Sequence, residues 1–323
     1  MKKILISTLG LFACASAFAE ISDNDYGGKL ITGDYTATEL YEANGNSTEI
    51  ANIVLNGSIR ITSSDNELAT GNGGYVLETT TAHKMGMSTT YTFRVAEKGT
   101  GSISLESGST GSISLKTGMN SYGGDLTVSV AKDAGGYVYV PKVGSQSGET
   151  TTLLLDKEYA IRKSDKEKFF TVMATGGAKI HIDMSADQFI KTDLRDSSTL
   201  EVTITNNANL YLAVGSVLDN DSKVTLLVND GLENGAILFA KDSVSSGYNT
   251  TDASIVVVDG AGDIETIYVK DANGELIKNL IWDATLVDGY YALYGVSAVP
   301  EPAEWAMIFG ALALGLAVYK RRK

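Results

Sequence analysis

The chain has 323 residues and a formal net charge of −13 at pH 7. The acidic excess disfavours nucleic acid as a partner, because nucleic-acid phosphates would repel the surface. The single cysteine, Cys14, lies near the N-terminus, so the rest of the chain has no disulfide and no thiolate for catalysis or metal binding. A chain of this size without a disulfide must be held together by one long hydrophobic core.

Residues 1–19 have the three parts of a signal peptide. Lys2-Lys3 is the positive segment, the stretch from Ile4 to Ala13 is mostly apolar, and Ala17-Phe18-Ala19 is a small–x–small cleavage site. We therefore expect the chain to be exported, with Glu20 as its mature N-terminus. A lipid-modified Cys14 is the alternative start.

The body, residues 20–298, has the pattern of short β-strands separated by turns. Apolar and polar residues alternate in runs such as Leu126–Val130, Ile180–Met184 and Leu200–Ile204, and turn residues recur about every ten residues. Helix signals are few, and Ser185-Ala-Asp-Gln188 is a candidate capping box. The pattern predicts an all-β body.

A short repeat suggests how the strands are arranged. Gly101-Ser-Ile-Ser-Leu105 recurs as Gly111-Ser-Ile-Ser-Leu115, and such segments could stack as rungs or pair as a hairpin. From about Thr48 to Val228 the chain resembles the right-handed parallel β-helix of autotransporter passengers. The fold we expect is a right-handed parallel β-solenoid with an antiparallel C-terminal cap, in which residues 270–275 form a hairpin turn. Two β-sandwiches are the alternative, because the same alternation would serve them.

The last 25 residues, 299–323, contain three elements in order. The first is the motif Val299-Pro300-Glu301-Pro302, and the second is an uncharged apolar run that ends at Tyr319. The third is the basic cluster Lys320-Arg321-Arg322-Lys323. A helix from Ala303 to Tyr319 would be about 25 Å long, which fits a bilayer with local thinning and snorkelling of the basic side chains. A buried core helix is the alternative.

The apolar run is the predicted membrane anchor. Aromatic residues bracket it, as an interfacial belt would require. The positive-inside rule keeps the basic cluster in the cytoplasm and places the body outside. The anchor residues that we single out are Trp305, Phe309, Leu312, Leu316 and Tyr319.

The three elements together resemble the bacterial PEP-CTERM sorting signal, a segment that has also been labelled an ice-binding-protein C-terminal domain. The resemblance implies that a membrane-embedded exosortase, a protease with a cysteine nucleophile, recognises Pro300-Glu301-Pro302 and cuts nearby. It also implies release of the body to the cell surface or to an exopolysaccharide matrix. Ala303-Glu304 departs from the small polar residues of many members, which leaves the cleavage position open.

The body offers little support for catalysis. His181 alternates with Ile180 and Ile182, which places it on a polar, solvated strand face. His83 lies in a loop without a nucleophile motif. A polysaccharide lyase, the main enzymatic alternative, would need an arginine or lysine beside clustered carboxylates. We expect no such cluster beside any of the arginines of the body, which are Arg60, Arg94, Arg162 and Arg195.

Metal and ice binding have weak sequence support. Asp219-Asn-Asp221, Asp259–Asp263 and Asp271–Glu275 offer oxygen ligands at the short spacing that calcium uses, but none matches an EF-hand loop. We expect turns there and no cofactor, and bound Ca²⁺ is the alternative. An ice-binding face needs Thr-x-Thr ranks on every rung, whereas Thr90-Tyr-Thr92 and Thr203-Ile-Thr205 are isolated, so we do not expect ice binding.

These observations predict a non-enzymatic structural or adhesive protein of the cell surface or biofilm matrix. It would be held first as a precursor anchored in the inner membrane and then processed through its C-terminal signal. The expected partners are the exosortase, membrane lipid and extracellular polysaccharide. A polysaccharide-active enzyme on a β-helix, of the lyase kind, is the alternative function.

Overall fold

The computed structural model confirms the all-β prediction. Strands make up 58% of the chain. The residues that the structure describes are 19–68, 76–80, 92–121, 124–146, 148–216, 222–228, 236–258, 264–271 and 273–295.

Most strands pair in parallel and stack into three columns. Two columns belong to a 21-stranded sheet and the third is a 5-stranded sheet. The first column, paired in parallel throughout, consists of β2 (Lys29–Thr36), β4 (Ile53–Ile61), β7 (Thr100–Leu105), β10 (Asp125–Val130), β13 (Thr150–Leu155), β16 (Lys179–Met184), β18 (Thr199–Ile204), β20 (Lys223–Val228) and β24 (Ile264–Asp271).

The other two columns run alongside the first. The second consists of the start of β4 followed by β6 (Phe93–Val95), β9 (Met119–Asn120), β12 (Lys142–Gln146), β15 (Phe170–Thr175), β17 (Gln188–Leu194), β19 (Leu210–Ser216) and β21 (Ala236–Ala240). The third consists of β3 (Glu49–Ala51), β5 (Val76–Thr80), β8 (Ser112–Leu115), β11 (Val138–Tyr139) and β14 (Ile161–Arg162).

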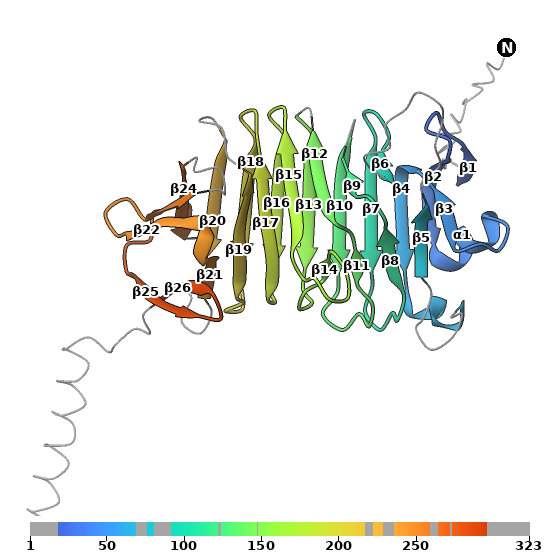
Figure 1. The fold of residues 1–323 in the computed structure, drawn as a ribbon. Coiled ribbons are helices and arrows are strands. Elements are labelled where there is room, and N and C mark those ends of the chain that lie inside the picture. The colour runs from blue at the N-terminus through green and yellow to red at the C-terminus, as the bar shows by residue number, and fades with distance from the viewer. Residues whose placement is uncertain are drawn as a thin grey trace, which may run out of the picture.

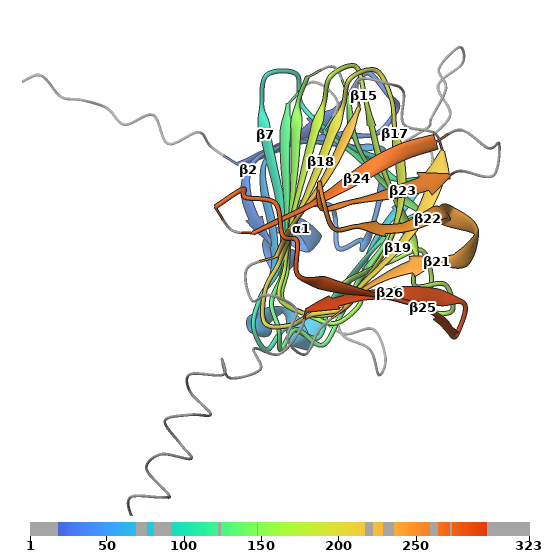
Figure 2. The same ribbon diagram turned by 90° about the vertical axis from the view of Figure 1, so that its left-hand side faces the viewer.

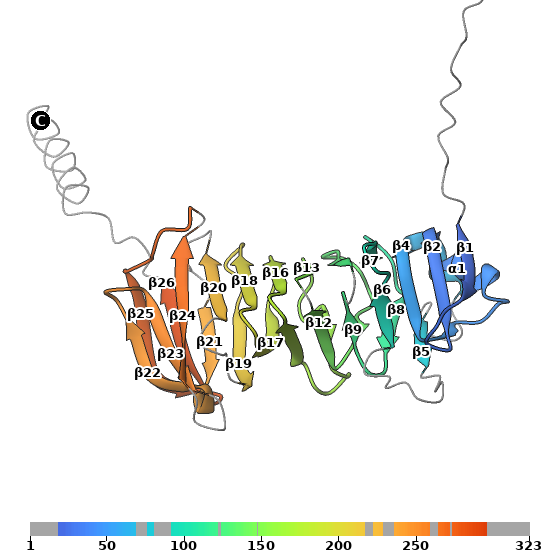
Figure 3. The same ribbon diagram turned by 90° about the horizontal axis from the view of Figure 1, so that it is seen from above.

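The chain visits the columns in turn and so coils around one axis. It passes through β10, β11 and β12, one in each column, and returns to the first column at β13. Gly101 pairs with Leu126 and Leu126 with Thr151, so each of these coils takes 25 residues. Figure 1 shows the strands side by side along the axis, Figure 2 shows them surrounding the interior, and Figure 3 shows the stack from above. Parallel pairing excludes the alternative of two antiparallel β-sandwiches.

Alternating side chains fill the interior with one continuous core. In β10, for example, every second residue is buried. Ile103, Val128 and Leu153 are fully buried and occupy the same register position in successive coils. The same row continues through Ile182 and Val202. Burial of each such side chain is worth about 1.5–3 kcal/mol, so the stack is held by its core, as expected for a chain without disulfides.

The ten-residue repeat plays a role that neither sequence prediction anticipated. Its first copy lies in β7, which pairs with β4 and β10, and its second lies in β8, which pairs with β5 and β11. The copies therefore occupy two columns of one coil and do not pair with each other. Both the rung and the hairpin predictions were wrong, because ten residues carry the chain around one corner and a coil takes 25.

The parallel stack is longer than the predicted span from Thr48 to Val228. It begins at β2 and ends at β24. β4 passes from the second column to the first at Gly57, whose φ of +147° and close approach to the carbonyl oxygen of Gly33 leave no room for a Cβ.

An antiparallel cap closes the C-terminal end, as predicted. It contains β22 (Val244–Asn249), β23 (Ser254–Val258), β25 (Leu280–Val287) and β26 (Tyr290–Gly295), and β26 also pairs with β21. The predicted hairpin turn is present, since Lys270 forms an antiparallel bridge with Leu276. A 3₁₀ turn, Lys241–Ser243, precedes β22.

A strand and a helix close the N-terminal end. β1 (Glu20–Asp23) pairs antiparallel with β2, and α1 (Ala37–Ala43) buries Ala37 and Leu40 in the core. The helix begins with a capping box between Thr36 and Glu39 that the sequence analysis missed.

The predicted capping box at Ser185–Gln188 was wrong. Gln188 begins β17, and its buried side chain accepts a hydrogen bond from the backbone N–H of Ala160 and donates one to the carbonyl of Lys157. Its side chain therefore serves a neighbouring coil rather than a helix end.

A buried carboxylate ties the N-terminal helix to the first coil. Asp65, in the 3₁₀ helix Ser63–Leu68, accepts hydrogen bonds from the backbone and hydroxyl of Thr38 and of Thr62, at 2.6–2.8 Å. Burial acts to raise the pKa of Asp65, but the hydrogen bonds outweigh it and hold the pKa below its usual value.

Candidate functional site

The predicted terminal signals lie almost entirely outside the described residues. Of the signal-cleavage residues only Ala19 is described, and Ala17 is not. Also outside are the sorting motif, the anchor residues and the basic cluster, that is, residues 299–323. Within the part of the chain that the structure does describe, no helix has the length and apolarity needed to span a bilayer.

His181 lies on the solvated face predicted for it. Its side chain is 41% exposed, and its Nδ1 is 3.4 Å from Oε1 of Glu201 on the next coil. His83 lies outside the described residues.

Of the candidate calcium and ice motifs, the structure describes Asp271, which starts a turn, Thr92, which is in the core, and Thr203 and Thr205, which are half-buried. Asp271 accepts hydrogen bonds from the backbone N–H groups of Asn273 and Glu275, which hold the pKa of its carboxyl below the usual value. The other two acidic motifs lie wholly on residues that the structure does not describe. Thr92 is fully buried and bonded to Thr79 at 2.8 Å, so it belongs to no surface rank. The described residues contain no group of three or more metal-ligating side chains.

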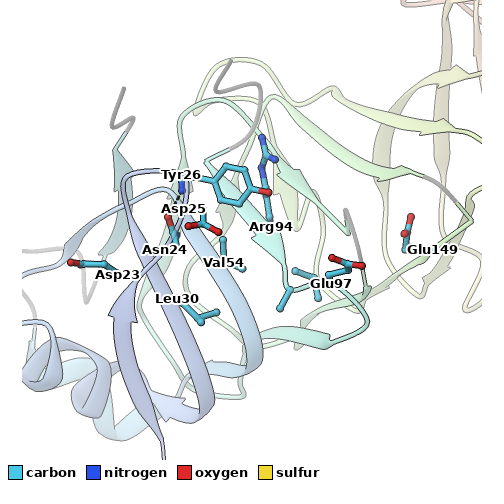
Figure 4. A pocket seen from close by; sticks show the side chains of 11 residues that line it. Asp23, Asn24, Asp25, Tyr26, Leu30, Val54, Arg94, Glu97 and Glu149 are labelled. Carbon is cyan, nitrogen blue, oxygen red and sulfur yellow. Dashed lines mark hydrogen bonds between the residues drawn. The ribbon is translucent and has the colours of Figure 1, made fainter. Parts of the chain in front are cut away.

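The prediction that no arginine lies beside clustered carboxylates was wrong for Arg94. This side chain lines a cavity of about 550 Å³ near the N-terminal end of the stack, which we call the N-terminal pocket. Figure 4 shows the side chains around it. The charged and aromatic residues of the pocket are Asp23, Asp25, Tyr26, Arg94, Glu97 and Glu149.

The wall of the N-terminal pocket is a loop fixed by Asn24. The amide nitrogen of Asn24 donates to the carbonyls of Lys29 and Asn52, at 2.8 and 2.6 Å. Its amide oxygen accepts from the backbone of Tyr26 and Gly28, at 2.9 and 3.0 Å. The loop therefore holds a set conformation against the second coil.

Arg94 and Tyr26 form one side of this pocket. The Arg94 guanidinium carbon is 4.4 Å from the centre of the Tyr26 ring, a cation–π contact. Glu97 and Glu149 lie apart from this pair in Figure 4. Sequence reasoning missed the pocket because its residues come from the β1–β2 loop, from the end of β6 and from the β12–β13 turn. Only the coiling of the chain brings these segments together.

A second hollow, of about 500 Å³, lies where successive coils turn out of the first column. We call it the corner groove. Ser185 donates a hydrogen bond to Asp156 of the preceding turn at 2.6 Å, and Asp187 accepts from the backbone and amide of Asn209 at 2.7 and 3.0 Å. The residues that line the groove are Lys132, Tyr137, Asp156, Lys157, Glu158, Ser185, Ala186, Asp187, Asn206, Asn207 and Ala208.

Beside the groove, half-buried aromatic rings form a row along the outside of the stack. Phe189 and Tyr211 are stacked with centres 4.0 Å apart, and Tyr290 meets Tyr211 edge-on. Phe169 and Tyr159 pack on Phe189, at 4.9 and 5.1 Å. We call these five residues the aromatic row.

Cations cover ring faces beside this row. The Lys168 ammonium is 3.9 Å from the centre of the Tyr159 ring, and the Arg162 guanidinium carbon is 3.6 Å from that of Tyr137. Desolvation by burial raises the pKa of Tyr159 and of Tyr211. Because the ring faces contact one another and the cations, the row stabilises the stack and offers no flat platform to a ligand.

Comparison with known proteins adds no relative to this description. No family model, no curated protein and no solved structure matches the chain.

Proposed function

We propose that this protein is an exported structural or adhesive component of the cell surface or exopolysaccharide matrix, and that it binds polysaccharide along the corner groove. The groove is the observation that carries the proposal. It follows successive coils, and charged, amide and hydroxyl groups line it. An extended polymer of hydroxyl-rich units fits such a surface, because carboxylates accept and lysine and asparagine donate hydrogen bonds.

The terminal signals supply the export and anchoring part of the proposal. The signal peptide sends the body out of the cytoplasm, and the PEP-CTERM-like tail holds the precursor in the membrane until an exosortase cuts it. The described stack ends at Gly295, only a few residues before Val299. The antiparallel cap is therefore the end nearest the anchor. We also propose that the stack is a right-handed solenoid.

A binding assay on the secreted protein tests the proposal. Neutral, acidic and amine-bearing polysaccharides would be screened by affinity electrophoresis, with and without Ca²⁺. We expect at least one to bind, and Lys157→Ala together with Asp156→Ala to weaken that binding by about tenfold or more, which is about 1.4 kcal/mol. Lys163→Ala, at an exposed ion pair with Glu167, is the control. Failure of every polysaccharide to bind would contradict the adhesive function and leave a passive scaffold.

One observation favours the lyase-like enzyme as a second candidate. Arg94, Tyr26 and several carboxylates share a pocket, and a lyase needs a cation, a proton acceptor and a proton donor in one place. Incubation with acidic polysaccharides tests this candidate, since β-elimination leaves an unsaturated, ultraviolet-absorbing chain end. Turnover that Arg94→Ala abolishes would support the enzyme.

A further inference from the structure

We propose that the N-terminal pocket binds an amine-bearing sugar unit, one that carries a protonated amino group. This inference rests on the proposed function, since it assumes a polysaccharide ligand. It names a second binding site, which shares no lining residue with the corner groove, and the charge of the sugar unit that this site accepts.

The charges of the pocket select against acidic sugars. Four carboxylates line the pocket, and Arg94 is the single cation among its lining residues. Asp23 is paired with Lys29 at 2.7 Å, so the other three, Asp25, Glu97 and Glu149, outweigh Arg94. The pocket is therefore net negative, so it repels a uronate and attracts an ammonium group. Its volume of about 550 Å³ lies within the range of small-ligand sites.

A buried polar atom without a partner lies in the wall of the pocket. Oε2 of Glu149 is buried and has no hydrogen-bond partner in the chain. Asn120, in register with Arg94 of the preceding coil, also has a fully buried amide without a partner, but it is not among the residues that line the pocket.

Native proteins rarely leave buried polar groups unpaired, so Oε2 of Glu149 calls for a partner that the chain itself does not supply. A sugar in the pocket supplies an ammonium group for the carboxylates of its wall, among them Glu149. A metal ion fits less well, because the described residues hold no three-ligand group and Arg94 would repel it.

Figure 4 suggests how the sugar would lie. Arg94 and Tyr26 are together on one side of the hollow, while Glu97 and Glu149 lie away from them. In this arrangement Arg94 donates hydrogen bonds to ring and hydroxyl oxygens. The ammonium group lies toward Glu97 and Glu149, away from the positive charge of the guanidinium.

The test is calorimetry on the secreted protein at low salt with three probes of equal length: oligomers of glucosamine, of N-acetylglucosamine and of galacturonate. We expect the glucosamine oligomer to bind at least about tenfold more tightly than the other two, which corresponds to about 1.4 kcal/mol. We also expect its affinity to fall as salt is added.

Two substitutions locate the site. Glu97→Gln and Glu149→Gln keep side-chain shape and should each weaken glucosamine binding by about fivefold or more, as expected for loss of a charged partner. Glu106→Gln, at an exposed ion pair with Arg60, is the matched control and should leave binding unchanged.

The outcomes for this inference differ from those for the proposed function. Equal binding of the acetylated oligomer, preference for the uronate, or glucosamine binding that survives both Glu→Gln substitutions would overturn the inference. Any of these results leaves polysaccharide binding at the corner groove intact. Failure of all polysaccharides, including those screened against the groove, would remove both.

Discussion

The corner groove and the N-terminal pocket are built in different ways. The groove comes from the same corner of successive coils, and polar groups such as Ser185 and Asp187 already have partners on neighbouring turns. The pocket comes from segments far apart in the sequence, and Glu149 of its wall leaves a buried carboxylate oxygen unpaired. In the repeated surface of the groove, these polar groups form hydrogen bonds with neighbouring turns. At the irregular end of the stack, a polar atom remains without a partner in the chain, and a ligand would supply one.

The largest effect should come from the core that both regions share. Ile182→Ala removes a fully buried side chain between Leu153 and Val202, and we expect it to cost about 2–5 kcal/mol of unfolding free energy. Urea unfolding measures the loss. His181→Ala, the outward-facing neighbour, should cost less than about 0.5 kcal/mol. Similar losses in the two variants would contradict the inward and outward assignments.

Asp65→Ala should weaken the N-terminal end by about 2–3 kcal/mol, because its carboxylate accepts hydrogen bonds from both Thr38 and Thr62. Hydrogen exchange should show faster opening around the N-terminal pocket than around the corner groove. Glu67→Ala, an exposed neighbour, is the control. Uniform acceleration along the whole stack would show that the end does not open by itself.

The same carboxylate predicts a pH dependence. Its pKa is lower in the folded than in the unfolded state, so its contribution to stability is present above the unfolded value, about 3.9, and is lost as pH falls through the folded pKa. Urea unfolding of the wild type and of Asp65→Asn between pH 5 and 2 measures this, since the neutral amide should flatten the curve. Parallel curves would refute the assignment.

A smaller effect is expected in the aromatic row. Tyr211→Leu keeps much of the apolar volume but removes the stack with Phe189 and the contact with Tyr290, so we expect a loss of about 1 kcal/mol. Thermal unfolding measures it. Tyr268→Leu, at an exposed tyrosine, is the control. A loss of affinity in the corner groove without a loss of stability would mean that the ring contacts the ligand, contrary to our assignment.

The smallest expected change in stability comes from a substitution in the corner groove that should still weaken polysaccharide binding. Ser185→Ala removes one partly exposed hydrogen bond to Asp156 and should cost less than about 1 kcal/mol. Because Asp156 then loses its fixed orientation, polysaccharide affinity at the groove should still fall, by about twofold to fivefold. Binding of glucosamine oligomers at the N-terminal pocket should not change. A change at both sites would show that the two are coupled.

The sequence by itself determined the fold class and the direction of the side chains. Period-two alternation fixed which residues of Ile180–Met184 enter the core, and it placed His181 outside, because a strand turns successive side chains to opposite faces. Turn chemistry likewise indicated the hairpin at residues 270–275. Both signals act over a few residues, so they can be recognised without a structure.

Predictions from local sequence patterns were wrong where contacts with another coil determine the structure. Thr36–Glu39 and Ser185–Gln188 have the same capping-box pattern, yet only the first opens a helix. The second lies where a parallel partner strand is available, and Gln188 finds its hydrogen bonds on the neighbouring coil. The prediction from the repeat at residues 101–115 was wrong for the same reason. Its ten-residue spacing corresponds to one corner of a coil, whereas a full coil there takes 25 residues.

Only the tertiary structure decided the candidate sites. Arg94 has no carboxylate cluster beside it in the sequence, but coiling brings the β1–β2 loop and the β12–β13 turn to its sides. The length of each coil sets which residues meet, and that length depends on turn conformations that alternation does not encode. The sequence therefore specifies what each strand buries, and the stacking of the coils specifies what its outer face can bind.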